Sequence, residues 1–343
     1  MEKETKSRIS LKSWPIIRGG IGILLGSLIL YLLFNRVSPQ VLLTELAQVD
    51  KVKIIWAVTF IGLSYVCRAA LWKRLMHQFH NYRYGAVFRS TMVGYLANNI
   101  LPARLGDVVR GAYLYLTQGG SSGFIFGSLA LERVMDVSII LVSLGIISFF
   151  LDLHYAWLVQ SAAILGSLVI IFFTIVAVVR YLTQRDLYSL PPFLTRIKGQ
   201  VSRFVSRTLV MNLGNVMGLG NARWGIPWLV ITWFVTFWGI YFTLDSLGLT
   251  RQIGLLQVAL ILGIGSLGLA VPSLPASLGT YQAAFIFGAM LVGVPESKAL
   301  SASFLYQGLW VGVTSILGLL SMAWEGVSFK KLVKQFKGMV AIR

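Results

Sequence analysis

The sequence predicts an all-α protein that crosses a membrane several times. Of its 343 residues, 56% are hydrophobic and only 12% are charged, and the mean hydropathy is +0.76. Soluble domains carry roughly 25% charged residues, so this composition excludes an ordinary soluble fold. Several apolar runs reach the length of about 20 residues that a helix needs to cross a hydrocarbon core. We therefore expect a polytopic integral membrane protein.

Six apolar runs are long enough to span, and two further runs are interrupted. The expected spans are residues 16–34, 53–72, 124–151, 157–180, 224–244 and 298–324. The interrupted runs, 86–117 and 254–293, are too short on either side of their break to span alone. We predict that each forms a re-entrant helical hairpin. The chain then is a single membrane domain, 1–343, with one repeat half at 16–151 and the other at 157–324.

The two interruptions share a sequence. Leu101-Pro102-Ala103-Arg104-Leu105-Gly106 recurs as Leu274-Pro275-Ala276-Ser277-Leu278-Gly279, with one substitution and an offset of about half the chain. In membrane proteins, such matching breaks indicate discontinuous helices and a binding site near the middle of the bilayer. The residues expected to break the helices are Pro102, Gly106, Pro272, Pro275 and Gly279.

The distribution of basic residues predicts the orientation. The N-terminus, 73–89, 180–223 and the tail together hold 20 Lys and Arg, against 5 in the loops of the opposite side. This asymmetry predicts that both termini lie in the cytoplasm. We expect the protein to lie in the plasma membrane. This orientation holds only if each hairpin enters and leaves the membrane on the same side. The second half of the chain is then inverted relative to the first.

The net charge of +18 is explained by these basic loops and not by nucleic-acid binding. The segment 181–223 contains apolar residues at helical spacing with basic residues between them over 193–210. This pattern predicts an amphipathic helix that lies on an anionic lipid surface. A basic tail, 325–343, follows the last span. Cys67 is the only cysteine, so no intrachain disulfide or cysteine cluster forms, and we expect neither cofactor nor metal.

Three charges lie at the first break. Arg104, Asp107 and Arg110 are expensive at membrane depth and are therefore functional candidates. Asp107 begins a half-helix whose free N–H groups attract an anion, and the two arginines have the planar fork that suits phosphate. In the alternative interpretation, Asp107 caps its helix and pairs with Arg110, while Arg104 reaches toward the cytoplasmic face.

Three more charges lie within the apolar run 124–151. Glu132 and Asp136 are four residues apart and share a helix face, with Arg133 beside it. These groups should face the protein interior, with Arg104 and Arg110 as partners of the two carboxylates. The pattern leaves open whether the group is a substrate site or a structural charge cluster. No catalytic motif or soluble catalytic domain is evident, so an enzyme is the less favoured class.

These motifs resemble a known family. Leu101 to Arg110, Leu131-Glu132-Arg133-Val134-Met135-Asp136 and Pro272-x-x-Pro275-x-x-x-Gly279 are similar to the marks of the flippase-like family. That family includes the transmembrane region of lysylphosphatidylglycerol synthase and archaeal glycosyltransferase-associated membrane proteins. The resemblance implies a domain that moves a lipid between leaflets. Two departures are Ala276-Ser277, where the family is richer in glycine, and Gln282, where a glutamate is frequent.

We therefore expect translocation of an anionic or polar-headed lipid, either a phospholipid or an isoprenoid-linked sugar. Two alternatives stay open: an interfacial enzyme of lipid or glycan assembly, and a non-catalytic membrane partner of a glycosyltransferase. The protein could also form homo-oligomers. The expected substrate-binding residues are Arg104, Asp107, Arg110, Glu132, Arg133, Asp136, Ser277 and Gln282.

Overall fold

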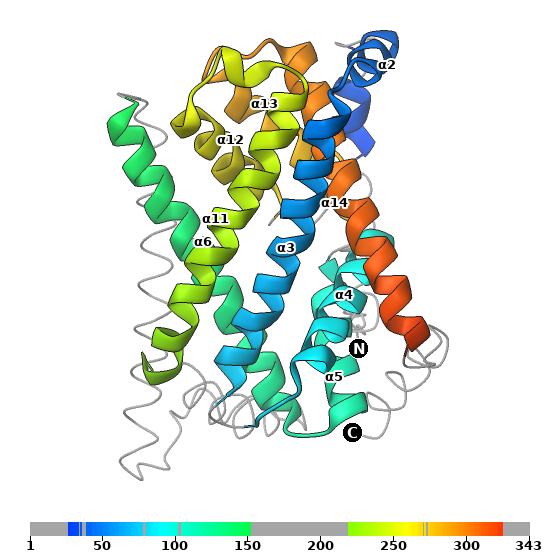
Figure 1. The fold of residues 1–343 in the computed structure, drawn as a ribbon, viewed down its shortest axis with the longest axis vertical. Helices are drawn as coiled ribbons and strands as arrows, with labels where there is room; N and C mark the ends of the chain where they lie inside the picture. Colours follow the sequence, from blue (N-terminus) through cyan, green and yellow to red (C-terminus); the bar gives the residue numbers. More distant parts are fainter. Residues whose placement is uncertain are drawn as a thin grey trace, which may run out of the picture.

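The computed structural model describes residues 27–33, 35, 39–77, 80–101, 104–151, 219–269, 271 and 274–324. Within these ranges every regular element is a helix, so the protein is all-α as predicted. Figure 1 shows long helices packed side by side along the molecule, with shorter helices between them. The short helix α2 (Pro39–Ala47) precedes the first long one, and two 3-10 turns, η3 (Leu249–Arg251) and η4 (Pro275–Ser277), lie in connections.

Four described helices are long and apolar enough to cross a membrane. They are α3 (Lys51–Met76), α6 (Ser122–Phe150), α11 (Leu219–Ser246) and α14 (Glu296–Trp324). These helices coincide with four of the six predicted spans. The predicted span 157–180, most of 16–34, the surface segment 193–210 and the tail 325–343 lie outside the described residues.

Helices α3 and α11 pack antiparallel along most of their length. Asp50 caps the start of α3, where its carboxylate accepts hydrogen bonds from the backbone N–H groups of Val52 (2.9 Å) and Lys53 (3.4 Å). The Asp50 N–H donates to the carbonyl of Ser246 at the end of α11 (3.1 Å). The Lys53 ammonium lies 2.9 Å from the Asp245 carboxylate. The first turn of α3 is thus fastened to the last turn of α11.

Both interrupted segments form two helices around a break, as predicted. Helix α4 (Tyr84–Ile100) is followed by α5 (Gly106–Gln118), and α12 (Leu255–Gly268) by α13 (Thr280–Met290). In each pair the second helix folds back on the first at a glycine. A Cβ on Gly106 would lie 2.1 Å from the Gly94 carbonyl oxygen, and one on Gly268 would lie 2.6 Å from the Thr280 carbonyl oxygen. Only glycine permits so close an approach of the backbones.

The two helical hairpins lie toward opposite ends of the molecule (Figure 1). Each is covered by a long helix from the other half of the chain. Gly318 of α14 lies against α4, where an added Cβ would meet Leu96 at 2.6 Å, and Gly263 of α12 lies against Leu144 of α6 in the same manner, at 2.7 Å. Helix α4 also contacts η4, which belongs to the second break. The two breaks therefore approach each other in the interior of the protein.

Candidate functional site

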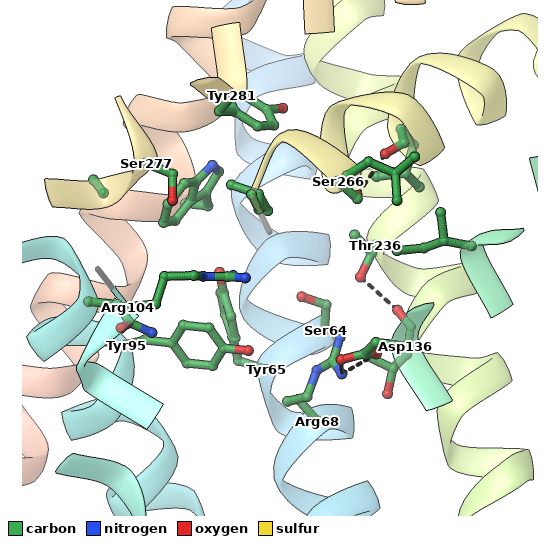
Figure 2. Close-up of a pocket in the computed structure, with 18 of the residues that line it drawn as sticks. Ser64, Tyr65, Arg68, Tyr95, Arg104, Asp136, Thr236, Ser266, Ser277 and Tyr281 are labelled. Carbon is green, nitrogen blue, oxygen red and sulfur yellow. Dashed lines mark hydrogen bonds and ion pairs between the residues drawn. The ribbon is translucent and has the colours of Figure 1, made fainter. Parts of the chain in front are cut away.

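A cavity of about 190 Å³ lies where the two breaks meet. Its lining comes from both hairpins and from all four long helices α3, α6, α11 and α14. Arg104 joins the lining from the first break and Ser277 from the second, and Figure 2 shows both side chains among the residues of the lining. Residues from the two sequence repeats therefore build one chamber.

The backbone at each break has an unusual conformation. Arg104 has a φ of 56°, and Ala276 and Ser277 have φ values of 56° and 59°. Left-handed backbone is uncommon for residues other than glycine and costs about 1–3 kcal/mol, and such residues cluster at functional sites. The conformation turns the chain sharply between the two helices of each hairpin. It thereby brings the side chains of Arg104 and Ser277 to the cavity wall.

Amide side chains hold the two breaks. The N–H of Gly106, the first residue of α5, donates to Asn98 Oδ1 (2.7 Å), and the N–H of Gly279 donates to Gln282 Oε1 (2.8 Å). Gln307 of α14 donates from Nε2 to the Ala276 carbonyl (2.8 Å) and accepts from the Gln282 amide. These bonds satisfy backbone groups that the broken helices leave open. Of the predicted break residues, Gly106, Pro275 and Gly279 lie at the observed breaks between helices. Pro102 and Pro272 lie outside the described residues.

Asp136 is the central carboxylate of the cavity wall and is 6% exposed. Nη1 of Arg68, from α3, lies 2.6 Å and 2.7 Å from its two oxygens. Nε1 of Trp233, from α11, donates to Oδ1 (3.1 Å), and Nη1 of Arg133 donates to Oδ2 (3.5 Å). Three helices therefore converge on one carboxylate. The prediction that Arg104 would be its partner was wrong, because Arg68 occupies that place.

Asp107, in the first turn of α5, pairs with Arg133 of α6. Arg133 Nη2 donates to Asp107 Oδ1 at 2.8 Å, and both side chains are partly exposed, at 32% and 28%. The alternative in which Asp107 pairs with Arg110 is therefore wrong. Arg133 instead links two acids, one on its own helix and one on the first hairpin.

Arg110 is buried in the protein core and is not among the residues that line the cavity. Its Nη1 donates to Glu132 Oε1 at 3.0 Å, and its guanidinium lies 4.0 Å from the centre of the Trp72 ring. The two side chains are 1% and 0% exposed. Glu132 thus has the partner that the sequence predicted. Within the described part of the chain, Arg110 Nε and Nη2 and Glu132 Oε2 have no hydrogen-bond partner.

The eight predicted substrate-binding residues divide into two groups. Arg104, Arg133, Asp136 and Ser277 line the cavity. Asp107, Arg110, Glu132 and Gln282 do not line the cavity; they form ion pairs or cap a helix. Arg68, Trp233 and the tyrosines of the lining were not predicted from the sequence. Arg68 could have been found, because it is a charged residue inside an apolar helix of 26 residues.

Among the residues that the structure describes, the charges around the cavity do not balance. Arg68, Arg104, Arg110 and Arg133 face three carboxylates, those of Asp107, Glu132 and Asp136. Each carboxylate is paired with at least one guanidinium. Arg104 lines the cavity and, among the described residues, forms no hydrogen bond or ion pair. One net positive charge is therefore presented to the cavity by Arg104.

The helices and the site together define a polytopic α-helical membrane protein with an internal, positively charged chamber between two helix breaks. The chain belongs to the family of the lysylphosphatidylglycerol synthase TM region, whose model matches residues 20–318. This match confirms the resemblance found in the sequence motifs.

Two relatives support the family assignment. The chain is 26% identical to "Glycosyltransferase AglD" of Haloferax volcanii, over 92% of this chain and 55% of that protein. It is 28% identical to "UPF0104 membrane protein MJ1078" of Methanocaldococcus jannaschii, over 61% of this chain and 86% of that protein. The chain therefore spans about half the length of the glycosyltransferase, and much of that protein has no counterpart in the alignment.

Proposed function

We propose that the protein moves a lipid with an anionic or polar head group from one leaflet of the plasma membrane to the other. The head group would enter the cavity while the hydrocarbon chains stay in the bilayer. The observation that carries the proposal is the position of Arg104, an unpaired guanidinium on the wall of an internal cavity, among helices long enough to span. A charge at that depth is expensive unless a ligand uses it.

The arrangement of the hairpins supports an alternating mechanism. In our proposal the hairpins are re-entrant, α4–α5 opens to the cytoplasm, α12–α13 opens to the outside, and the two halves form an inverted repeat. Movement of one hairpin against the other would then expose the same cavity to each side in turn, as in transporters built from inverted repeats. Both termini would be cytoplasmic, with the segment 193–210 on the anionic inner surface.

The predicted site residues have two roles in this proposal. Arg104 binds phosphate, and Ser277, Arg133 and Asp136 complete the wall that the head group contacts. Asp107, Arg110, Glu132 and Gln282 act indirectly, because they hold the helices and break residues that carry this wall. We assign each residue to one of these roles by whether its side chain lines the cavity, and not by its residue type.

A reconstitution experiment tests translocation. Purified protein is inserted into vesicles that contain a fluorescent phosphatidylglycerol, and the fraction accessible to an impermeant quencher is followed with time. We expect faster loss of fluorescence than in protein-free vesicles, and a rate at least tenfold lower for Arg104→Gln. Arg83→Gln is the matched control, because Arg83 is exposed and precedes α4 outside the cavity. A rate equal to that of empty vesicles, tested with both phospholipid and isoprenoid-linked probes, would contradict the proposal.

One observation favours a second role, as the membrane partner of a glycosyltransferase. The relative "Glycosyltransferase AglD" contains a region similar to this chain within a protein of nearly twice the aligned length. If the present protein works with such an enzyme, it should co-purify with one from the native membrane after mild solubilisation. The association should survive Arg104→Gln, because that residue lies inside the cavity and not on an outer face.

A further inference from the structure

Among the described residues, each acid around the cavity is already paired with an arginine, and Asp136 is the acid that lines the cavity itself. Asp136 already receives Arg68, Trp233 and Arg133, and Asp107 receives Arg133. Glu132 is fully buried against Arg110 and does not line the cavity. To pair with Asp136, an ammonium group in the chamber would have to displace an arginine from this carboxylate. It would also meet the net positive charge that Arg104 presents, in an interior where charges are poorly screened.

The remaining polar groups of the wall are neutral and suit hydroxyl groups. The hydroxyls of Ser64, Thr236 and Ser266 donate to carbonyls of their own helices, each at 2.7 Å. Their oxygen lone pairs are then left to accept hydrogen bonds from a ligand. Figure 2 shows these three residues on the side of the cavity that faces Arg104. A ligand that donates hydroxyl protons there can place its phosphate against Arg104.

Aromatic rings make up much of the rest of the lining. The rings belong to Tyr65, Tyr95, Trp233, Tyr281, Tyr306 and Trp310. Aromatic side chains combine an apolar face with a polar edge, which suits a compact polyol or sugar with alternating C–H and O–H groups. Electron-rich faces also attract ammonium groups. Within this wall, however, the neighbouring arginines repel a further cation. We expect this repulsion to exceed the attraction of the rings.

We infer that the cavity selects a lipid phosphate whose head group is otherwise uncharged and hydroxylated, and that it discriminates against head groups that carry an ammonium. This inference rests on the proposed function for the identity of the site, but it concerns binding and not movement. Phosphatidylglycerol and a polyprenyl phosphate sugar share the required chemistry. Lysylphosphatidylglycerol, the lipid in the name of the family, has the phosphate but adds the cationic charges that the site opposes.

Binding to the purified full chain in detergent tests the selectivity. Native mass spectrometry would measure apparent Kd values for phosphatidylglycerol, lysylphosphatidylglycerol and polyprenyl-phosphate glucose, the first two with identical acyl chains. We expect at least one of the two uncharged hydroxylated head groups to bind at least tenfold more tightly than lysylphosphatidylglycerol. The uncharged lipid that binds more tightly shows whether the ligand is a glycerophospholipid or an isoprenoid lipid. Equal or tighter binding of lysylphosphatidylglycerol would overturn the inference.

Variants of cavity residues test whether the selectivity arises in this cavity. Arg104→Glu should reverse the preference, so that lysylphosphatidylglycerol binds more tightly than phosphatidylglycerol, whereas Arg83→Gln should leave the ratio of the wild type. Should Arg104→Glu not fold, Ser277→Asp introduces a carboxylate on the facing wall and should narrow the ratio at least threefold. An unchanged ratio in each folded variant would show that the lipids bind elsewhere, and would overturn the inference.

The two proposals fail separately. If selectivity is present but vesicle-embedded protein moves no lipid, the translocation proposal is wrong and the binding inference stands. If lipid moves at equal rates for both head groups, and the Kd values are equal, the inference is wrong while translocation stands.

Discussion

Arg104 and Ser277, which occupy equivalent places in the repeated hexapeptide, have the same left-handed backbone conformation, with φ values of 56° and 59°. Both line the same cavity from different hairpins. The repeat thus preserves a backbone geometry, while its one substitution changes the chemistry that this geometry presents. One break supplies a cation and the other a neutral hydroxyl.

Arg104→Gly should separate the backbone from the side chain. Glycine adopts a positive φ without steric cost, so the left-handed strain of about 1–2 kcal/mol is relieved. The greater freedom of glycine in the unfolded chain offsets roughly 0.5–1 kcal/mol of this gain. We therefore expect a Tm in detergent equal to or slightly above that of the wild type, together with at least a tenfold loss of phosphatidylglycerol movement.

Arg68→Gly is the comparison variant. It removes the ion pair with Asp136 and places glycine inside α3, which alone costs about 1 kcal/mol, so its Tm should fall clearly. If Arg104→Gly lowers the Tm as much as Arg68→Gly, then the Arg104 side chain holds the fold and is not reserved for a ligand.

The buried ion pair of Arg110 and Glu132 should stabilise the fold and should not contact the lipid. Arg110→Met leaves Glu132 without its 3.0 Å partner in a fully buried position, and breaking such a pair costs about 3–5 kcal/mol. The double variant Arg110→Met with Glu132→Leu removes both charges and should recover most of this loss. Thermal unfolding in detergent measures the effect. A double variant no more stable than the single one would mean that Glu132 is held by other groups, such as Arg68, whose Nη1 lies 3.6 Å away.

The sequence predicted the helices well, because apolar runs of the length of a bilayer leave little choice of structure. The ends of α6 and α14 lie within two residues of the predicted spans, and both breaks fall at the repeated proline and glycine motif. The hexapeptide also predicted that the two breaks belong together. These features depend on local composition and on a repeat that can be read directly from the chain.

Apart from the pair of Arg110 and Glu132, the charge pairs could not be read from the chain. Asp136 and Arg68 are 68 residues apart, and Asp107 and Arg133 are 26 apart, so their contacts depend on how α3, α5 and α6 pack. Spacing along one helix predicted the face shared by Glu132 and Asp136, but it gave no information on the facing helix. Arg68 was overlooked because it is a single charge without a motif around it.

The proposed inverted arrangement, in which the two hairpins open to opposite sides of the membrane, predicts asymmetric labelling. In a Cys67→Ser background, Gln118→Cys at the base of the first hairpin should react with a membrane-impermeant maleimide only after the cytoplasmic face is opened. Pro295→Cys, at the base of the second hairpin, should react in intact cells. Both positions are exposed, whereas the neighbouring Val294 is only 3% exposed and is unsuitable. Labelling of both cysteines from one side would rule out the inverted arrangement.

Asp107→Asn should strengthen the binding of an anionic head group and slow its movement. Asp107 holds Arg133 through a bond of 2.8 Å, and Arg133 also lines the cavity. Because the pair is partly exposed, its loss should cost only about 0–1 kcal/mol of stability. The freed guanidinium gives the cavity a second cation, and a hydrogen bond between charged groups contributes about 1.5 kcal/mol or more, which corresponds to roughly tenfold tighter binding. A transported group must also leave, so tighter binding should lower the rate of movement.

Asp245→Asn is the matched control for this last change. Asp245 has a similar partly exposed ion pair, with Lys53 at 2.9 Å, but it lies at the far ends of α3 and α11, away from the cavity. Its substitution should change neither the Kd of phosphatidylglycerol nor the rate of movement. If Asp107→Asn instead weakens binding while its Tm stays within a few degrees of the wild type, then Arg133 must be held by Asp107 to bind the head group. The ion pair would in that case orient the site, and Arg104 would not act alone.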